Sequence, residues 1–160
     1  MALDQHILLA YAPTNNSTVR LSSQNFPGEI YFDLNSIPDQ QPGDWGNFPR
    51  GAARALQQKH QLSRGLVGMT SGKMAEGGLS SSAAIGIAYL LALEEVNQLE
   101  VTRKENIHLD QAIENHYLGL RNGILDQSAI LLSKKLAELA PGSLNRTFFC
   151  GGGSEAVEIA

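Results

Sequence analysis

One stretch near the middle of the chain combines glycines and serines: Gly77-Gly78-Leu79-Ser80-Ser81-Ser82-Ala83-Ala84. It lies between a predicted strand and a predicted helix. The first N–H groups of a helix have no internal partner, and the helix dipole adds positive potential there. Glycines let the backbone approach an anion closely, and serine hydroxyls add donors or a metal ligand. The stretch indicates phosphate binding, although the P-loop pattern is absent and a serine-capped helix after a loop explains the same residues.

Two acidic residues, Glu114 and Asp126, stand twelve positions apart, on either side of a break marked by Gly119 and Gly123. Mg²⁺ prefers hard oxygen ligands, and a carboxylate within reach of a hydroxyl can accept its proton. Each acid also has an ordinary explanation, as a solvated helix residue or as an acid in a first helical turn. Their occurrence together with the serine stretch favours the functional interpretation, in which both acids and Ser82 meet at one pocket.

The single tryptophan of the chain, Trp45, lies in the segment Asp44-Trp45-Gly46-Asn47-Phe48-Pro49-Arg50-Gly51. An indole ring can stack on a nucleobase. A tryptophan that only packs at the start of a helix fits the segment equally well, so both explanations stay open at this point.

A mostly apolar strand is expected over residues 3–11, and strands with alternating polar and apolar residues over 18–22 and 29–34. Their succession suggests a meander. A loop over 35–46 separates them from a predicted helix over 48–62, whose first turn contains Pro49.

A strand over 65–70 precedes the glycine–serine stretch, and the apolar helix predicted over 83–96 is expected to be buried. Thr102 and Glu105 have the spacing of a capping box, which starts a further helix. Its predicted core face consists of Leu109, Ala112, Ile113 and Leu120. A last helix is expected over 125–139 and a short strand over 147–150. Because strands and helices are mixed rather than strictly alternating, the fold class is α+β.

The composition is that of an ordinary globular protein, with 42% apolar and 18% charged residues among 160. The formal net charge of −4 excludes a generally basic nucleic-acid binder. Cys150 is the single cysteine and cannot form an internal disulfide, so we expect a cytoplasmic protein. No apolar run reaches the roughly 18 residues of a membrane span, and the first six residues do not resemble a signal peptide.

The glycine–serine stretch closely resembles the second motif of the GHMP kinases, the superfamily of galactokinase, homoserine, mevalonate and phosphomevalonate kinases. The triple serine is most similar to the sugar kinase branch, galactokinase in particular. The segment from Glu114 to Gln127 resembles the galactokinase pattern of a glutamate, glycines and Gly-x-x-Asp-Gln. The segment around Trp45 is similar to the Trp-x-Asn-Tyr-x-x-Gly of galactokinases.

The resemblance implies a fold like domain 2 of ribosomal protein S5, a truncated α+β domain with a mixed sheet and helices packed on one side. Residues 1–135 would form a partial N-terminal, ATP-binding domain, and residues 136–160 a divergent tail. ATP would be held by Trp45 and by the stretch Gly77, Gly78, Leu79, Ser80, Ser81, Ser82 and Ala83. Ser82 and Glu114 would hold Mg²⁺, and Asp126 would accept the proton of the sugar hydroxyl.

The implied function is an ATP-dependent sugar kinase, with ATP and a sugar as partners and with neither nucleic acid nor membrane. The alternative is a catalytically inactive nucleotide-binding or assembly module derived from such a kinase. Two departures favour the alternative: Glu76 stands near the expected phosphates, and the sugar-binding Gly-Glu-His-Thr-Asp of galactokinases does not occur in these residues. A missing opening strand would expose a sheet edge, through which we expect homo-oligomers to form.

Overall fold

The computed structural model describes residues 7–72, 81–120 and 123–140. They form four strands, four α-helices and one π-helical turn. The elements are β1 (Ile7–Pro13), β2 (Thr18–Ser23), β3 (Glu29–Asp33), α1 (Asn47–Gln57), β4 (Leu66–Gly72), α2 (Ser81–Val96), α3 (Arg103–Ala112), η1 (Ile113–Tyr117) and α4 (Leu125–Leu139).

The four described strands form a mixed sheet in the order β1-β4-β2-β3. β4 is antiparallel to β1 and parallel to β2, whereas β2 and β3 pair antiparallel. The predicted meander is therefore wrong, because β4 lies between β1 and β2. Gly65 permits this insertion: a Cβ there would lie 1.9 Å from the carbonyl oxygen of Thr18, and the N–H of Gly65 donates to Asn16 O at 2.7 Å.

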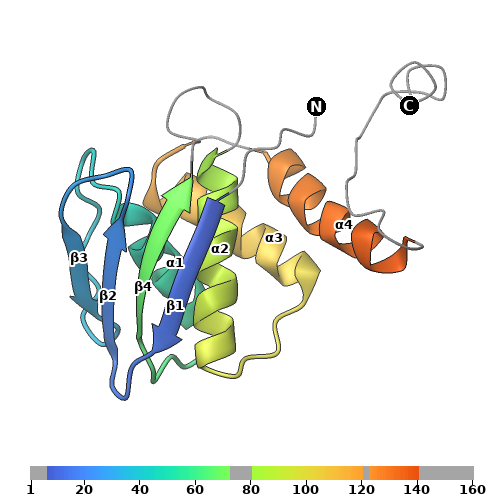
Figure 1. The fold of residues 1–160 in the computed structure, drawn as a ribbon. Helices are drawn as coiled ribbons and strands as arrows, with labels where there is room; N and C mark the ends of the chain where they lie inside the picture. The colour runs from blue at the N-terminus through green and yellow to red at the C-terminus, as the bar shows by residue number, and fades with distance from the viewer. Residues whose placement is uncertain (1–6, 73–80, 121–122, 141–160) are drawn as a thin grey trace.

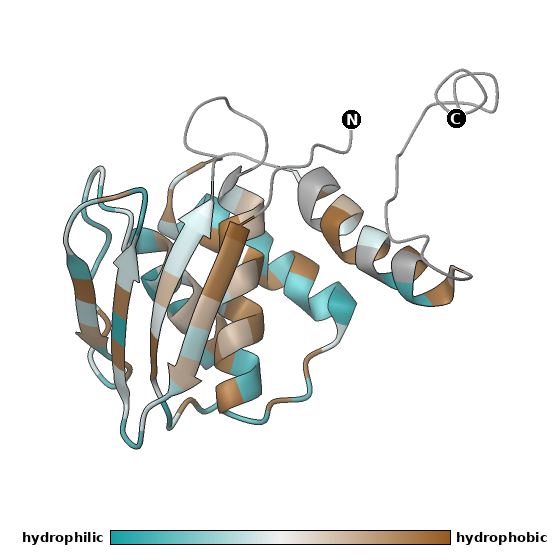
Figure 2. Ribbon diagram, in the orientation of Figure 1, coloured by the Kyte–Doolittle hydropathy of each residue, from teal (hydrophilic) through white to brown (hydrophobic). Residues whose placement is uncertain are grey.

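The helices α1, α2 and α3 lie on one face of the sheet (Figure 1). The buried core between the two layers includes Val19, Leu21 and Phe32 from the sheet and Leu56 and Leu90 from the helices. In Figure 2, α2 is predominantly apolar along its length, as expected for a helix that packs between the sheet and α3. This arrangement confirms the predicted mixed sheet with helices on one side.

Local sequence features predicted the starts of α1 and α3 correctly. Pro49 lies in the first turn of α1, and the N–H of Glu105 donates to the hydroxyl of Thr102 at 3.2 Å at the start of α3. The predicted helix over 48–62 is shorter than expected, since α1 ends at Gln57.

The core face predicted for the helix after Thr102 is only partly right. Leu109 and Ile113 are buried, but Leu120 is 40% exposed because the helix has ended before it, at Tyr117. The backbone then turns at Gly119, whose φ of 71° is in the left-handed region that favours glycine.

Two further predictions are not tested. The strand over 147–150 lies outside the described residues. The domain boundary after residue 135 stays a prediction, and α4 continues across that position to Leu139. Within the described part of the chain, none of the helices is both long and apolar enough to cross a membrane.

Candidate functional site

A partly buried ion pair holds the start of α1, and a separate hydrogen bond fixes Trp45. Arg50 Nη1 lies 2.8 Å from Asp44 Oδ2, and the N–H of Gly46 donates to Asp44 Oδ1 at 2.9 Å. Burial raises the pKa of Asp44, but the hydrogen bond from Gly46 and the Arg50 guanidinium outweigh it, so its pKa lies below the ordinary value. The indole Nε1–H of Trp45 donates to Pro27 O at 3.3 Å. The ring is thereby tied to the β2–β3 turn.

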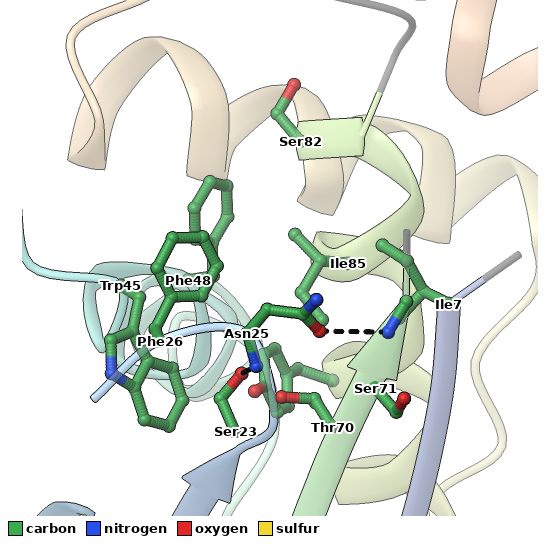
Figure 3. Close-up of a pocket in the computed structure, with 12 residues that line it drawn as sticks. Ile7, Ser23, Asn25, Phe26, Trp45, Phe48, Thr70, Ser71, Ser82 and Ile85 are labelled. Carbon is green, nitrogen blue, oxygen red and sulfur yellow. Dashed lines mark hydrogen bonds between the residues drawn. The ribbon is translucent and has the colours of Figure 1, made fainter. Parts of the chain in front are cut away.

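Trp45 lies at a cavity between the β2–β3 turn, the end of β4 and the start of α2 (Figure 3). Aromatic rings of Phe26, Trp45 and Phe48 form one side, and Ile7 and Ile85 lie on the other. The cavity encloses about 140 Å³. Sites that enclose a whole drug-sized ligand are roughly 300–1,000 Å³, so this cavity suits one flat ring system rather than a complete nucleotide.

Ser82 lines the same cavity and connects it to Glu114. The Ser82 hydroxyl donates to Glu114 Oε1 at 2.5 Å, across 32 positions of sequence. Ser82 lies in the first turn of α2, where backbone N–H groups lack helical acceptors. Glu114 is only 2% exposed. The structure therefore brings together two of the three residues that the sequence predicted to meet.

Glu114 owes its position to a π-helical turn. In η1 the N–H of Leu118 donates to Ile113 O at 2.9 Å, a bond that spans five residues. Such turns are rare and occur frequently at functional sites. The preceding turn of α3 lies close to α2 as well, since a Cβ on Gly86 would be 2.0 Å from Asp110 Oδ1. Gly86 allows the close approach that sets Ser82 beside Glu114.

The structure describes the other predicted site residues only in part. Asp126 is the second residue of α4, and Figure 1 shows this end of α4 at the same end of the molecule as the start of α2. The Asp126 side chain is outside what the structure describes, as are residues 77–80 and the side chain of Ser81. Ala83 is fully buried in the first turns of α2.

Sequence reasoning missed several residues of the cavity. Asn25, Thr70 and Tyr89 line it but come from a turn, a strand end and a helix interior. No motif marks them. The sequence contained one signal, the aromatic residue Phe26 in a turn with proline and glycine. In the structure this side chain is 46% exposed and thus available to a ligand.

Comparison with known proteins shows to which family this mixed sheet with helices on one face belongs. Residues 47–134 match the family described as GHMP kinases N terminal domain. This match covers more than half of the chain, so the chain belongs to the GHMP kinase family.

Among curated relatives, a galacturonokinase of Arabidopsis thaliana is 46% identical over 152 residues, covering 83% of this chain and 36% of that protein. A galactokinase of Bacillus subtilis is 36% identical over 138 residues, covering 84% of this chain and 35% of that protein. The chain thus spans about a third of the length of these relatives.

Solved structures include one galactokinase and one more distant kinase of the same fold. The Lactococcus lactis galactokinase complexed with galactose has a TM-score of 0.75 and 31% identity, covering 79% of this chain and 34% of that one. A mevalonate kinase with a TM-score of 0.66 is 23% identical and covers 79% of this chain and 42% of that one. The second likeness shows the fold alone.

Proposed function

We propose that this chain is part of an ATP-dependent sugar kinase that transfers a phosphoryl group to a sugar hydroxyl. The observation that carries the proposal is that Ser82 lines the same cavity as Trp45 and donates a 2.5 Å hydrogen bond to Glu114. This arrangement supports a nucleotide with its base beside Trp45 and its phosphates over the first turn of α2. Residues 77–83 would cradle the phosphates, because N–H groups at a helix start attract anions.

Ser82 and Glu114 fit Mg²⁺ because both present oxygen atoms, which this ion prefers. Their oxygens already lie within hydrogen-bonding distance of each other, and the Glu114 carboxylate is buried. When bound, Mg²⁺ would neutralise charge on the transferred phosphate. Asp126 would accept the proton of the sugar hydroxyl, since a positioned carboxylate both orients a nucleophile and removes its proton.

For the acceptor we propose a sugar of the galactose or galacturonic acid type. The support is the names of the relatives, such as a galacturonokinase at 46% identity and a galactokinase at 36%. Because the chain spans about a third of these proteins, we propose turnover for a protein that contains it and nucleotide binding for the chain itself.

The single tryptophan gives a direct test of nucleotide binding. Addition of ADP with Mg²⁺ should change the emission of Trp45 in a saturable way. Ser82→Ala and Glu114→Gln should weaken the effect of Mg²⁺ on ADP affinity by about 10-fold, the cost of losing one charge-assisted contact. Leu139→Ala, an exposed change on α4, serves as the matched control and should bind as the unchanged chain does. A Trp45 emission that does not respond to millimolar Mg-ADP would contradict the proposal.

Catalysis is tested separately, as sugar-dependent ADP production. The protein for this test contains the chain and has the full length of its relatives. Either galactose or galacturonic acid should stimulate it, and Asp126→Ala should remove most of kcat while nucleotide binding persists. Nucleotide binding without any sugar-dependent ADP production would favour the alternative, a catalytically inactive module.

A further inference from the structure

We propose that Tyr117 is a positioning residue that couples the proposed metal ligand Glu114 to Trp45. The coupling runs through residues 37–47, a segment that Tyr117 holds near one end and that contains Trp45 near the other. The inference rests on the proposed function, because it assumes that a nucleotide lies beside Trp45 and that Mg²⁺ binds at Glu114. It gives the π-helical turn a second task besides carrying Glu114.

Tyr117 ties the turn of Glu114 to the 37–47 segment. It is the last residue of η1, three positions after Glu114. Its hydroxyl donates to Pro38 O at 2.7 Å, across 79 positions of sequence. A second bond accompanies it, since Gln40 Nε2 donates to Leu118 O at 3.3 Å. Two hydrogen bonds therefore join the end of η1 to the segment, each between a side chain and a backbone oxygen.

α1 supports Tyr117 in this position. Gly51 lets α1 lie against η1, because a Cβ there would be 3.2 Å from Tyr117 Cδ1. The Arg54 guanidinium lies 5.5 Å from the centre of the Tyr117 ring, within the range of a cation–π interaction. Arg54 Nη2 also donates to Ile37 O at 2.9 Å. Arg54 and Tyr117 thus bind adjacent carbonyl groups, so the segment cannot shift at this point without breaking both bonds.

The other end of the segment is closed around Trp45. The Asn47 side chain pairs with the backbone of Gln41: the N–H of Gln41 donates to Asn47 Oδ1 at 2.9 Å, and Asn47 Nδ2 donates to Gln41 O at 2.6 Å. Asn47 is only 4% exposed. The N–H of Asp44 also donates to Gln41 O, at 3.1 Å. Because packed and hydrogen-bonded groups transmit displacements rather than absorb them, a shift at the Tyr117 end should reach Trp45.

This connection predicts that the metal site and the nucleotide site support each other. A ligand that fixes Glu114 also fixes Tyr117 on the same turn, and so favours one position of Trp45. Such coupling is reciprocal, and it is measured as the factor by which Mg²⁺ raises the affinity for ADP. Part of this factor should depend on the Tyr117 hydroxyl.

Tyr117→Phe tests the coupling, because it removes the hydroxyl and keeps the ring beside Arg54. Trp45 emission gives the affinity for ADP with and without Mg²⁺, and the Mg²⁺ factor should fall about 2- to 10-fold, the effect of one hydrogen bond. In the free chain, without nucleotide or metal, acrylamide should quench Trp45 more strongly in Tyr117→Phe than in the unchanged chain. Gln40→Ala removes the neighbouring bond from an exposed side chain and should change both measurements in the same direction.

Tyr11→Phe is the matched control, since it also loses a phenol hydrogen bond, the one that Tyr11 donates to Glu95 Oε2 at 2.6 Å between β1 and α2. It should leave the Mg²⁺ factor and the quenching of Trp45 unchanged. If ADP binds and its Mg²⁺ factor does not depend on Tyr117 or Gln40, or if Tyr11→Phe lowers it equally, this inference alone is wrong. If Trp45 does not respond to Mg-ADP at all, the proposed function falls with it.

Discussion

Glu94 shows at the scale of a single residue how burial controls ionisation in this domain. It lies near the end of α2, is 7% exposed, and accepts a hydrogen bond from Asn106 Nδ2 at 3.2 Å. Burial raises its pKa, and the neighbouring Glu105 adds to the effect, whereas Asn106 and His60 oppose it. Since a carboxylate is costly to bury, the Glu94 carboxyl holds its proton more tightly in the folded state than in the unfolded chain.

A glutamine at this position should stabilise the protein in a pH-dependent way. Below the unfolded pKa, near 4, Glu94 is protonated in both states and carries no penalty. As the pH rises through the raised folded pKa, the native state must bury a charge that the unfolded state leaves in water, so stability is lost. Glu94→Gln should therefore raise the free energy of unfolding by about 1 kcal/mol at pH 7, with little gain at pH 4. Urea titrations at the two pH values measure this difference.

Glu100→Gln, at an exposed position, is the matched control and should have little effect at either pH. An equal gain for Glu94→Gln at both pH values would show that the carboxyl charge is not the cause.

At the scale of elements, the site depends on how closely α2 approaches α3 and η1. Ser82 meets Glu114 and, one turn further along α2, Gly86 meets Asp110, so the two helical segments run in opposite directions at this contact. The capping box at Thr102 starts α3, and the π-helical turn then sets Glu114 toward α2. The two halves of the proposed metal site thus come from different helices.

Gly86→Ala should separate these helices. The added Cβ would lie 2.0 Å from Asp110 Oδ1, and Asp110 is fully buried and has little room to move. Overpacking costs about 1–3 kcal/mol, and the better helix propensity of alanine recovers up to about 1 kcal/mol. We expect a net loss of about 1–2 kcal/mol in urea unfolding and a weaker effect of Mg²⁺ on ADP affinity.

Gly123→Ala provides the comparison, because nothing lies within 4 Å of a Cβ there. A stable Gly86→Ala protein with unchanged Mg²⁺ dependence would show that the close approach does not position Ser82.

At the scale of the whole molecule, the sheet face opposite the helices carries exposed apolar side chains. Register places Leu8, Val67 and Met69 on this face, with exposures of 59%, 44% and 46%. β1 forms one edge of the described sheet, and an edge strand presents unpaired backbone groups. Both features support the prediction of self-association made from the sequence.

Sedimentation at micromolar concentration should show species larger than one 160-residue chain. Leu8→Lys places a charge on the edge strand and should shift the distribution toward the monomer. Leu139→Lys is the control, since Leu139 is 69% exposed but lies on α4, away from the sheet. A single monomeric species for the unchanged chain would refute self-association.

The amino-acid sequence by itself determined the features that depend on neighbouring residues. The first turn of α1 with Pro49, the cap of α3 at Thr102 and the break at Gly119 follow from local backbone geometry and local hydrogen bonds. The family was also evident, because its motifs at Ser82, Glu114 and Asp126 are short and local in sequence.

Only the tertiary structure decided the features that join distant segments. The place of β4 between β1 and β2, the 2.5 Å contact of Ser82 with Glu114, and the cavity beside Trp45 each join residues at least 32 positions apart. Such contacts depend on how whole elements pack, and packing depends on the combined shape of many buried side chains, which no short segment specifies.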